Sequence, residues 1–468
     1  MPALQRPLAA VTLFHAKNCA RMHLSLRRYL QYAANTTRTP GMKPSVTAIS
    51  RSSLLAVLLT LTSSALQADG TTVIKAKAWL DVAAGKWITP ANIVIDKGMI
   101  SAINPADLPA GATVIELPNL MVLPGLIDVH THLSIEIVPG WEYEPVTWTI
   151  GELALRSGKN AERTLMAGFT TVRELGAFGF VDVATMKAID RGDVIGPHII
   201  PAGHALGITG GHCDITGFAP GIGEGDYRSG VADGVDEVVK AVRYQIKHGA
   251  KAIKVCATAG VLSFEGPVGA QQYSFEELKA AADETHRHGL KIAAHAHGTE
   301  GIIAASQAGI DFIEHDSIMT EEAANIIKKN GTWVTPNLYL NEAIDLDSLP
   351  PVIRAKLESL QPLLLESFQR DMAMNLKIAN GSDAGVYPHG QNAHELTARV
   401  SHGMAPLAAI RSATMDSAEA LGTPDRGQVK VGLMADLIAV SGDPLENISV
   451  LQDVPFVMKQ GVVYKQAE

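Results

Sequence analysis

The feature that most constrains this chain is a regular alternation, between residues 123 and 423, of short apolar runs with helical patterns. Eight such runs follow one another: LPGLIDVHTH, TTVREL, HIIPAG, AIKVCA, KIAAHA, DFIEHD, WVTPNL and KIANGSDA. Two of the helical patterns, VDEVVKAVRYQIKHG and SFEELKAAADETHRHG, end in a basic turn and the Gly that commonly stops a helix. The alternation is typical of parallel βαβ units. Eight units over about 300 residues predict an α/β fold, a (β/α)8 TIM barrel with its chemistry at the carboxyl ends of the strands.

The two ends of the chain beyond this region have a different sequence pattern. Residues 69–122 hold short β-type runs separated by turn residues, and similar runs return in residues 424–468 as ADLIAVSGD and FVMKQGVVYKQ. We therefore predict one small β-sandwich built from residues 69–122 and 424–468, attached to a barrel of residues 123–423.

The N-terminal segment is set apart by its charge, because residues 1–68 contain eight basic residues and no Asp or Glu. Residues 42–68 resemble a secretory signal peptide, with a short basic region, a short apolar run and small residues up to Ala65 or Ala68. The apolar run is shorter than the roughly 20 residues that a membrane span needs. A buried core helix and an organelle transit peptide are the alternatives. A signal peptide here predicts a periplasmic or secreted protein that has no membrane anchor after cleavage. Residues 1–41 are then an upstream extension.

Charge and cysteine content exclude further classes. The formal net charge of the whole chain is −9, and it becomes −17 without residues 1–68. Nucleic acid is not an expected partner, because phosphate binding depends on Lys and Arg patches. The three Cys form no C-x-x-C pair, so neither a thiolate zinc site nor a thioredoxin-type redox pair is predicted. Cys213 and Cys256 follow the signal peptide, and their spacing leaves open whether they pair.

The first apolar run ends in His130-Thr131-His132. Side chains two residues apart on a strand point the same way, so both imidazoles are expected to enter the barrel mouth together. There they can share one divalent metal ion or reach two adjacent ions. Alone the pair is a weak signal, since a chance pair on an exposed strand explains it better.

Lys254 lies in the fourth run, between Ile253 and Val255. Alternation sends the two apolar side chains outward to the helices and Lys254 inward, where an unpaired ammonium is costly. A salt bridge is one solution. Reaction of the neutral amine with carbon dioxide is another, because it gives an anionic carbamate that bridges two metal ions. The sequence leaves both open.

Three further runs end in side chains that can bind metal. The fifth run supplies His295 and His297, the sixth His315 and the eighth Asp383. A single histidine in any of these runs is also explained as a core residue, but five strands of one barrel with such endings predict a metal site. By alternation His297 shares the inward face with His295, so either can be the ligand.

With these residues the chain resembles the amidohydrolase superfamily. The resemblance runs from about Thr71 to the C-terminus and includes LPGLIDVHTH, TGGHCD, HAHG, GSDAGVYPHGQNAHEL and GLMADLIAVSGDPL. Within the superfamily the chain is most similar to the binuclear, prolidase-like branch, which includes Xaa-Pro dipeptidases, carboxypeptidases and amidohydrolases that cleave ochratoxin A.

The resemblance implies two divalent metal ions, expected to be zinc, bridged by a carbon dioxide-derived carbamate on Lys254. It assigns His130, His132 and Asp383 to the more buried ion, and His295 and His315 to the more exposed one.

A mechanism follows from that implied geometry. Two zinc ions lower the pKa of a shared water and make hydroxide available at neutral pH. Asp383 takes the proton of that water and later passes it to the leaving amine. The exposed ion polarises the scissile carbonyl, and His297 is the candidate for stabilising the developing oxyanion. The resemblance favours His295 over His297 as the metal ligand.

Candidate substrate contacts lie in loops. The loop over residues 204–214 is Gly-rich and polar, and His212 is its best contact. Tyr227 and Arg228 precede the fourth unit, where Arg228 is suited to grip a substrate carboxylate with two hydrogen bonds. A solvated loop explains both segments about equally well.

Two more histidines, His389 and His394, follow Asp383 closely. They either orient the Asp383 carboxylate as supporting residues or cap a helix. His389 is carried forward as a candidate substrate contact.

The leading prediction is a peptidase-like, metal-dependent amidohydrolase that cleaves an amide or peptide bond next to a free carboxylate. Its small-molecule substrate is expected to be an N-acyl amino acid, a dipeptide, or ochratoxin A, which would yield phenylalanine and ochratoxin alpha. Relatives with this fold commonly form homo-oligomers, which we expect here too.

Two alternatives stay open. A cyclic amide hydrolase or deaminase is the first, although deaminase-type members carry a catalytic Glu just after the fifth-strand His, where this chain has Ala296. A metal-binding scaffold without turnover is the second. Asp383 beside an open metal position argues against a scaffold, because a binding protein does not need that base.

Overall fold

The computed structural model describes residues 70–466 of the chain. The described residues all belong to one compact unit. The predicted upstream extension, residues 1–41, and the predicted signal peptide, residues 42–68, lie outside the described residues. No helix within the described range is long and apolar enough to cross a membrane.

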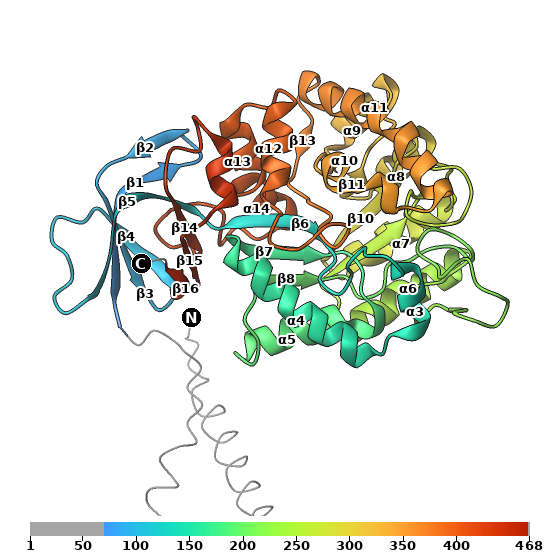
Figure 1. The fold of residues 1–468 in the computed structure, drawn as a ribbon, viewed down its shortest axis with the longest axis horizontal. Coiled ribbons are helices and arrows are strands. Elements are labelled where there is room, and N and C mark those ends of the chain that lie inside the picture. The colour runs from blue at the N-terminus through green and yellow to red at the C-terminus, as the bar shows by residue number, and fades with distance from the viewer. Residues whose placement is uncertain (1–69, 467–468) are drawn as a thin grey trace, which may run out of the picture. The chain divides into compact units, whose positions relative to one another are not determined.

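Strands from both ends of the described chain form one sheet (Figure 1). These strands are β1 (Thr72–Asp81), β2 (Lys86–Ile88), β3 (Ala91–Asp96), β4 (Met99–Ile103), β5 (Thr113–Pro124), β14 (Leu437–Val440), β15 (Phe456–Lys459) and β16 (Val462–Gln466). The strand order is β16-β15-β14-β5-β1-β3-β4, with β2 paired to β1. The two ends meet where β14 pairs with β5, with Leu437 opposite Pro124. Within residues 70–466 the two ends therefore share one hydrogen-bonded sheet of eight strands.

A strand coincides with each of the eight apolar runs to within one residue, as predicted. In chain order these strands are β6 (Leu126–Thr131), β7 (Phe169–Glu174), β8 (His198–Pro201), β9 (Ala252–Cys256), β10 (Lys291–Ala296), β11 (Phe312–His315), β12 (Trp333–Thr335) and β13 (Lys377–Ile378). Every pairing among them is parallel, which confirms the α/β class. Figure 1 shows the helices lying outside these strands.

The predicted closed barrel is not complete in the strand pairing of residues 70–466. The strands form a three-stranded sheet, β6-β7-β8, and a five-stranded sheet, β13-β12-β11-β10-β9. Isolated bridges join these sheets at both edges, between Thr131 and Ala384 and between Leu206 and Val255. At the first edge a side chain replaces part of the backbone ladder, because the Asn380 amide donates to a backbone carbonyl of β6 over 3.0 Å.

The helices begin and end at recognisable signals. They are α3 (Glu144–Thr147), α4 (Ile150–Met166), α5 (Val181–Asp190), α6 (Val235–His248), α7 (Phe275–Arg287), α8 (Thr299–Ala308), α9 (Glu321–Asn330), α10 (Leu340–Ala343), α11 (Pro351–Ala373), α12 (His394–Ser401), α13 (Pro406–Ser412) and α14 (Met415–Leu421), with short 3₁₀ turns η1 (Trp141–Tyr143), η2 (Phe178–Phe180), η3 (Leu346–Ser348) and η4 (Ile448–Gln452). Thr149 with Glu152 forms a capping box on α4, and Ser274 with Glu277 forms one on α7. As predicted, α6 stops at a Gly, because Gly249 adopts a left-handed φ of 114°.

Alternation along β9 decides what faces the helices and what faces the site. Ile253 and Val255 are fully buried in an apolar cluster that includes Val238 and Val242 of α6. Lys254, between them, lines the pocket described below. The strand thus gives apolar side chains to the helix layer and a polar side chain to the interior, as the sequence predicts.

Candidate metal centre and active site

The ends of five strands contribute to one pocket of about 340 Å³. The residues predicted as metal ligands or catalytic groups all line this pocket: His130, His132, Lys254, His295, His297, His315 and Asp383. Each of them except the half-buried His132 is buried. The structure therefore brings together side chains that are up to about 250 residues apart in the chain because parallel strands end at one edge.

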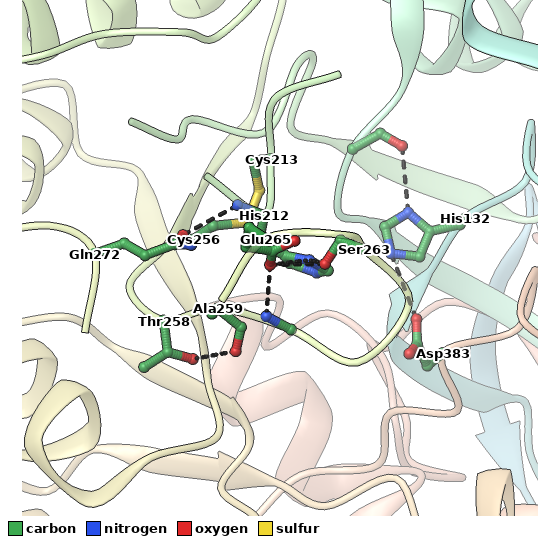
Figure 2. The surroundings of a disulfide bond; sticks show 12 residues. His132, His212, Cys213, Cys256, Thr258, Ala259, Ser263, Glu265, Gln272 and Asp383 are labelled. Atoms are coloured by element: carbon green, nitrogen blue, oxygen red, sulfur yellow. Dashed lines mark hydrogen bonds and ion pairs between the residues drawn. A yellow bond between two sulfur atoms is a disulfide. The ribbon is translucent and has the colours of Figure 1, made fainter. Parts of the chain in front are cut away.

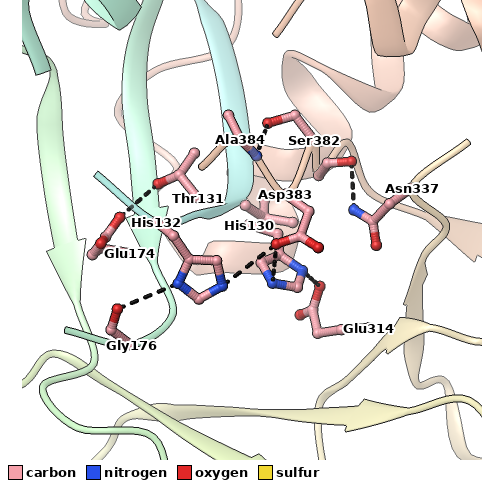
Figure 3. A network of polar contacts seen from close by, with 12 residues as sticks. His130, Thr131, His132, Glu174, Gly176, Glu314, Asn337, Ser382, Asp383 and Ala384 are labelled. Carbon is pink, nitrogen blue, oxygen red and sulfur yellow. Dashed lines mark hydrogen bonds and ion pairs between the residues drawn. The ribbon is translucent and has the colours of Figure 1, made fainter. Parts of the chain in front are cut away.

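Asp383 lies beside the two histidines at the end of β6 (Figure 3). Asp383 Oδ1 is 3.4 Å from His130 Nε2 and 3.4 Å from His132 Nε2. These distances are long for hydrogen bonds. Two ligand atoms that are each about 2.1 Å from a tetrahedral zinc ion lie about 3.4 Å apart. The Asp383 oxygen is thus spaced from each histidine nitrogen as two ligands of one metal ion would be.

Two groups of candidate ligand atoms share His315. Nitrogens of His295, His297 and His315 lie within 4.8 Å of one another, and His315 also belongs to a group with His130 and Asp383. His295 Nε2 is buried without a hydrogen-bond partner among the described residues, which is uncommon for a buried polar atom. His297 Nδ1, in contrast, lies 2.8 Å from a serine hydroxyl. This donor set of imidazoles and a carboxylate suits zinc or a similar divalent ion.

Burial keeps the histidines of the pocket in their neutral form. Desolvation, reinforced by Lys254 and neighbouring histidines, lowers the pKa of His130, His295 and His315 well below the usual value. Desolvation is also the main cause that lowers the pKa of His132 and of His297 to about 3. Neutral imidazole is the form that binds metal, so the pocket holds its histidines ready for ligation.

Lys254 is buried with 3% of its surface exposed. Burial lowers the pKa of the Lys254 amine, and the carboxylates of Glu314 and Asp383 oppose that shift. Within residues 70–466 the amine forms no hydrogen bond and no ion pair shorter than 4.0 Å. The salt bridge that the sequence left open is therefore not present in this structure.

Two candidate ligands have unusual backbone conformations. His315 has a φ of 74° and Asp383 a φ of 59°, in the left-handed region that residues other than Gly rarely adopt. Such a conformation costs about 1–3 kcal/mol and tends to occur at functional sites. At the end of β11 the left-handed conformation of His315 breaks the strand alternation. The consecutive side chains of Glu314 and His315 are both buried around the site.

A buried ion pair supports His130 from behind. Glu314 Oε2 lies 3.0 Å from His130 Nδ1, and Glu314 Oε1 accepts a hydrogen bond from Arg173 over 2.6 Å. The Arg173 guanidinium also stacks over the Phe312 ring at 3.8 Å. A carboxylate at one ring nitrogen of a histidine fixes which nitrogen faces a metal. Sequence reasoning missed this pair, although TTVREL and DFIEHD each carry a charged residue inside a strand that has to be buried.

The disulfide between Cys213 and Cys256 answers a question that the sequence left open. Figure 2 shows it beside His212, the predicted substrate contact of the loop after β8. His212 lines the pocket, and its ring centroid lies 4.1 Å from that of His295. The disulfide ties this loop to the end of β9, two residues beyond Lys254.

The other predicted substrate contacts lie elsewhere. His389 is buried behind the pocket, where its Nε2 lies 3.1 Å from the His132 carbonyl oxygen, so it supports that ligand rather than lining the cavity. His394 is the first residue of α12, and its ring stacks on Tyr339 at 4.8 Å.

Tyr227 and Arg228 are not among the described residues that line the pocket. The Arg228 side chain is 63% exposed and pairs with Asp226 over 2.7 Å. The Tyr227 ring packs under the Lys240 ammonium at 3.7 Å. Their guanidinium and ring are thus satisfied locally, and this structure does not bring them to a substrate.

The remaining wall of the pocket is apolar and comes from segments far apart in the chain. Its larger members are Trp141, Phe178, Phe218, Phe264, Leu357 and Leu360. These residues lie in loops, in η1 and η2 and on α11, so no periodic pattern marks them in the sequence. They give the cavity the character of a small-molecule site with a few polar groups at its base.

The fold and this site define a class of protein, and comparison with known proteins identifies it. Residues 121–464 match the amidohydrolase family, so the chain belongs to that family and the predicted resemblance is confirmed. Among individual relatives, the ochratoxinase of Aspergillus niger is 34% identical over 413 residues, which cover 81% of this chain and 84% of that protein.

Solved structures agree with this assignment. The crystal structure of a Xaa-Pro dipeptidase with bound methionine matches with a TM-score of 0.81 and 36% identity, covering 84% of this chain and 100% of that chain. The structure of a prolidase complexed with n-methylphosphonate-l-proline matches with a TM-score of 0.79 and 32% identity, covering 85% of this chain and 100% of that chain. Family and relatives together support hydrolysis of amide bonds.

Proposed function

We propose that this protein is a metal-dependent hydrolase that cleaves an amide or peptide bond next to a free carboxylate. The observation that carries the proposal is a pocket in which two overlapping groups of metal-ligand side chains meet an apolar cavity. Similarity to an ochratoxinase, a Xaa-Pro dipeptidase and a prolidase supports this reaction class.

We further propose that the eight strands act as a (β/α)8 barrel spanning residues 123–423, with the terminal sheet as an attached domain. Support comes from the two edges where the open sheets meet. At one edge the Asp383 amide donates to the His130 carbonyl over 2.8 Å, and at the other the Leu206 amide donates to the Lys254 carbonyl over 2.8 Å. These contacts continue the parallel order around the ring.

The side chains fit two divalent ions, which we propose to be zinc. His130, His132 and Asp383 would hold one ion, and His295 and His315 the other. Lys254, buried between charged neighbours without a partner of its own, would join both ions as a carbamate formed with carbon dioxide. Divalent ions at such a site supply a nucleophile from water at neutral pH and polarise a carbonyl group.

Two residues of the chain are proposed to handle protons and charge. Asp383, whose carboxyl has its pKa raised mainly by burial, would accept a proton at Oδ1 or Oδ2 and return it to the leaving amine. His297 would donate a hydrogen bond from Nε2 to the oxyanion in the tautomer whose Nδ1 accepts the Ser317 hydroxyl proton over 2.8 Å.

The apolar wall favours substrates with a bulky apolar group on one side of the scissile bond. Burying such a side chain contributes about 1.5–3 kcal/mol to binding. We therefore propose N-acyl amino acids or dipeptides with an apolar residue such as Phe as substrates. Ochratoxin A is included because of the ochratoxinase relative.

We also propose that the mature protein is exported and forms a homo-oligomer. Export is supported by the acid-free, basic segment of residues 1–68. Oligomer formation is supported by exposed apolar side chains on α4, where Leu155 is 79% and Ile150 48% exposed. Light scattering of the purified protein tests the second point, since a monomer would contradict it.

A substrate screen tests the proposed function. The panel holds N-acyl amino acids, Xaa-Pro and other dipeptides and ochratoxin A, with cyclic amides and amino-substituted bases as the competing class. We expect turnover of amides that carry a free carboxylate, and lower turnover when that carboxylate is converted to an amide. Turnover of cyclic amides or bases alone would contradict the proposal.

A further inference from the structure

His212 is held more tightly than a residue of a solvated loop would be. Its side chain is 20% exposed, and its Nδ1 lies 2.7 Å from Ser263 Oγ. A Cβ atom added to Gly260 would lie 2.3 Å from His212 Cε1, so the ring packs directly on the Gly260 backbone. With the His295 ring 4.1 Å away on another side, His212 occupies a slot at the edge of the candidate metal centre.

A short chain of hydrogen bonds leads from His212 to a carboxylate. Ser263 Oγ donates to Glu265 Oε1 over 2.7 Å, and the Gly260 amide donates to the same oxygen over 2.9 Å. Burial raises the pKa of Glu265, but hydrogen bonds from His212, Ser263 and Gly260 outweigh that effect and hold the pKa at about 2. Glu265 is therefore ionised at neutral pH, and an ionised carboxylate only accepts hydrogen bonds.

The charge of Glu265 fixes which atom donates in each of these hydrogen bonds. The Ser263 hydroxyl proton points to Glu265, so Ser263 Oγ has to accept from Nδ1–H of His212. The form of His212 with a single ring proton that fits these contacts carries that proton on Nδ1 and has a lone pair on Nε2. His212 Nε2 has no hydrogen-bond partner among residues 70–466, and the ring lines the pocket.

The segment that carries Ser263 and Glu265 is itself fixed from outside. The Lys356 ammonium of α11 donates to the carbonyl oxygens of Gly260, Ser263 and Glu265 over 3.3, 2.9 and 2.8 Å. On the other side, the His212 amide donates to Gln272 Oε1 over 3.1 Å, and the next residue is joined to β9 by the disulfide (Figure 2). Both partners of the His212–Ser263 contact are thus anchored to separate parts of the barrel.

We propose that Ser263 and Glu265 are positioning residues that hold His212 as its Nδ1–H tautomer, with Nε2 placed to accept a hydrogen bond from the N–H of a secondary substrate amide. This assignment rests on the proposed function for the identity of the substrate. The orientation of His212 itself rests on the contacts described above.

A double-mutant cycle tests whether Glu265 acts through His212. Metal content and kcat/KM are measured for wild type, His212→Asn, Glu265→Gln and the double variant, with a secondary amide that the wild type turns over. We expect a loss of about 100-fold for His212→Asn and about 10-fold for Glu265→Gln. In the His212→Asn background, Glu265→Gln should have no further effect, because the residue it positions is gone.

A surface variant provides the matched control. Glu358→Gln on α11 removes an exposed carboxylate that pairs with Arg354 over 2.8 Å. We expect wild-type kinetics for this control. An equal loss from Glu265→Gln in both backgrounds, or full activity of His212→Asn, would overturn the proposal.

A measurement without substrate separates this proposal from the proposed function. In protein labelled with ¹⁵N-histidine, the His212 signals are assigned by their absence from His212→Asn. We expect the Nδ1–H tautomer in wild type and a mixture of tautomers in Ser263→Ala. An Nε2–H tautomer in wild type would overturn the proposal even if the enzyme hydrolyses every expected amide. A wild type with the Nδ1–H tautomer that hydrolyses no carboxylate-bearing amide would instead contradict the proposed function alone.

Discussion

At the scale of single residues, Asp383 combines a left-handed backbone with contacts to two histidines that are candidate metal ligands. Its amide is held by the His130 carbonyl, so the position of the carboxylate is set by β6 as well as by its own segment. Burial raises the pKa of this carboxyl and Lys254 opposes the shift. These features suit a group that binds a cation and exchanges a proton.

The first prediction concerns Asp383→Asn. The amide keeps the size of the side chain but cannot take up a proton, so we expect kcat to fall by about 10²–10⁴-fold. Much of the bound metal should remain, because histidines supply most of the ligands. Kinetics and metal analysis on the same preparation check both parts. A variant with wild-type kcat would remove Asp383 as the base.

The second prediction concerns Lys459, far from the pocket. This residue of β15 is 6% exposed, and its amine donates to the Gly196 carbonyl over 2.5 Å. Burial lowers the pKa of Lys459 to about 8 from its ordinary value of 10.5, and the charge of Asp436 opposes that shift. Between these two pH values the unfolded chain holds a proton that the folded protein does not, so the free energy of unfolding should rise with pH.

We expect this gain to be at most about 3 kcal/mol between pH 8 and pH 10.5. Urea unfolding of wild type and Lys459→Met over that range measures it, because the variant lacks the titrating amine. The gain belongs to Lys459 only if the variant rises less steeply with pH than wild type. Parallel curves for the two proteins would contradict the prediction.

At the scale of elements, the disulfide is the cross-link between the loop after β8 and the end of β9. The two cysteines are 43 residues apart in sequence, and closing such a loop stabilises a protein by about 2–4 kcal/mol. The third prediction is that the free energy of unfolding of Cys213→Ser/Cys256→Ser, measured in urea, is lower than that of wild type by this amount. We also expect a lower kcat/KM, because His212 precedes Cys213.

Peptide mass spectrometry of the wild type under non-reducing conditions is the necessary companion measurement. It should find Cys213 and Cys256 in one linked peptide pair. Two free thiols in the folded, active wild type would contradict this part of the account. An unlinked protein with unchanged stability would contradict the energetic argument as well.

The elements were predictable to the extent that they follow a period. Seven of the eight strands lie inside the predicted runs and β7 begins one residue before its run, and Ile253, Lys254 and Val255 alternate as expected because a strand has a period of two. The incomplete pairing beside β13 has no such signal. There Asn380 replaces a backbone partner with its side chain, and only the tertiary structure reveals that exchange.

Loop residues were predicted less well for a related reason. Arg228 was expected to meet a substrate carboxylate because of its chemistry alone, but its nearest partner is Asp226, two residues away. An ion pair with a residue nearby in the sequence competes with a contact between the guanidinium and a substrate. Ser263 and Glu265 lie in an irregular segment, and their relation to His212 depends on contacts across about 50 residues of chain.

At the scale of the whole molecule, the residues of the site come from two kinds of segment, the ends of strands and the segments between them. The metal-ligand candidates come from strand ends, whose arrangement follows from the repeat of eight apolar runs and was predictable. The apolar wall comes from η1, η2, loops and α11, and the buried pair of Glu314 with Arg173 comes from within the strands. Specificity is therefore less visible in the sequence than reaction class, because specificity resides in segments without periodicity.

The central claim is that two overlapping ligand groups hold two metal ions in one pocket. Metal analysis of the purified protein by plasma mass spectrometry, expressed per chain, tests it most directly. We expect close to two zinc-like ions per chain, and loss of activity when a chelator removes them. One ion per chain, or full activity without metal, would contradict it.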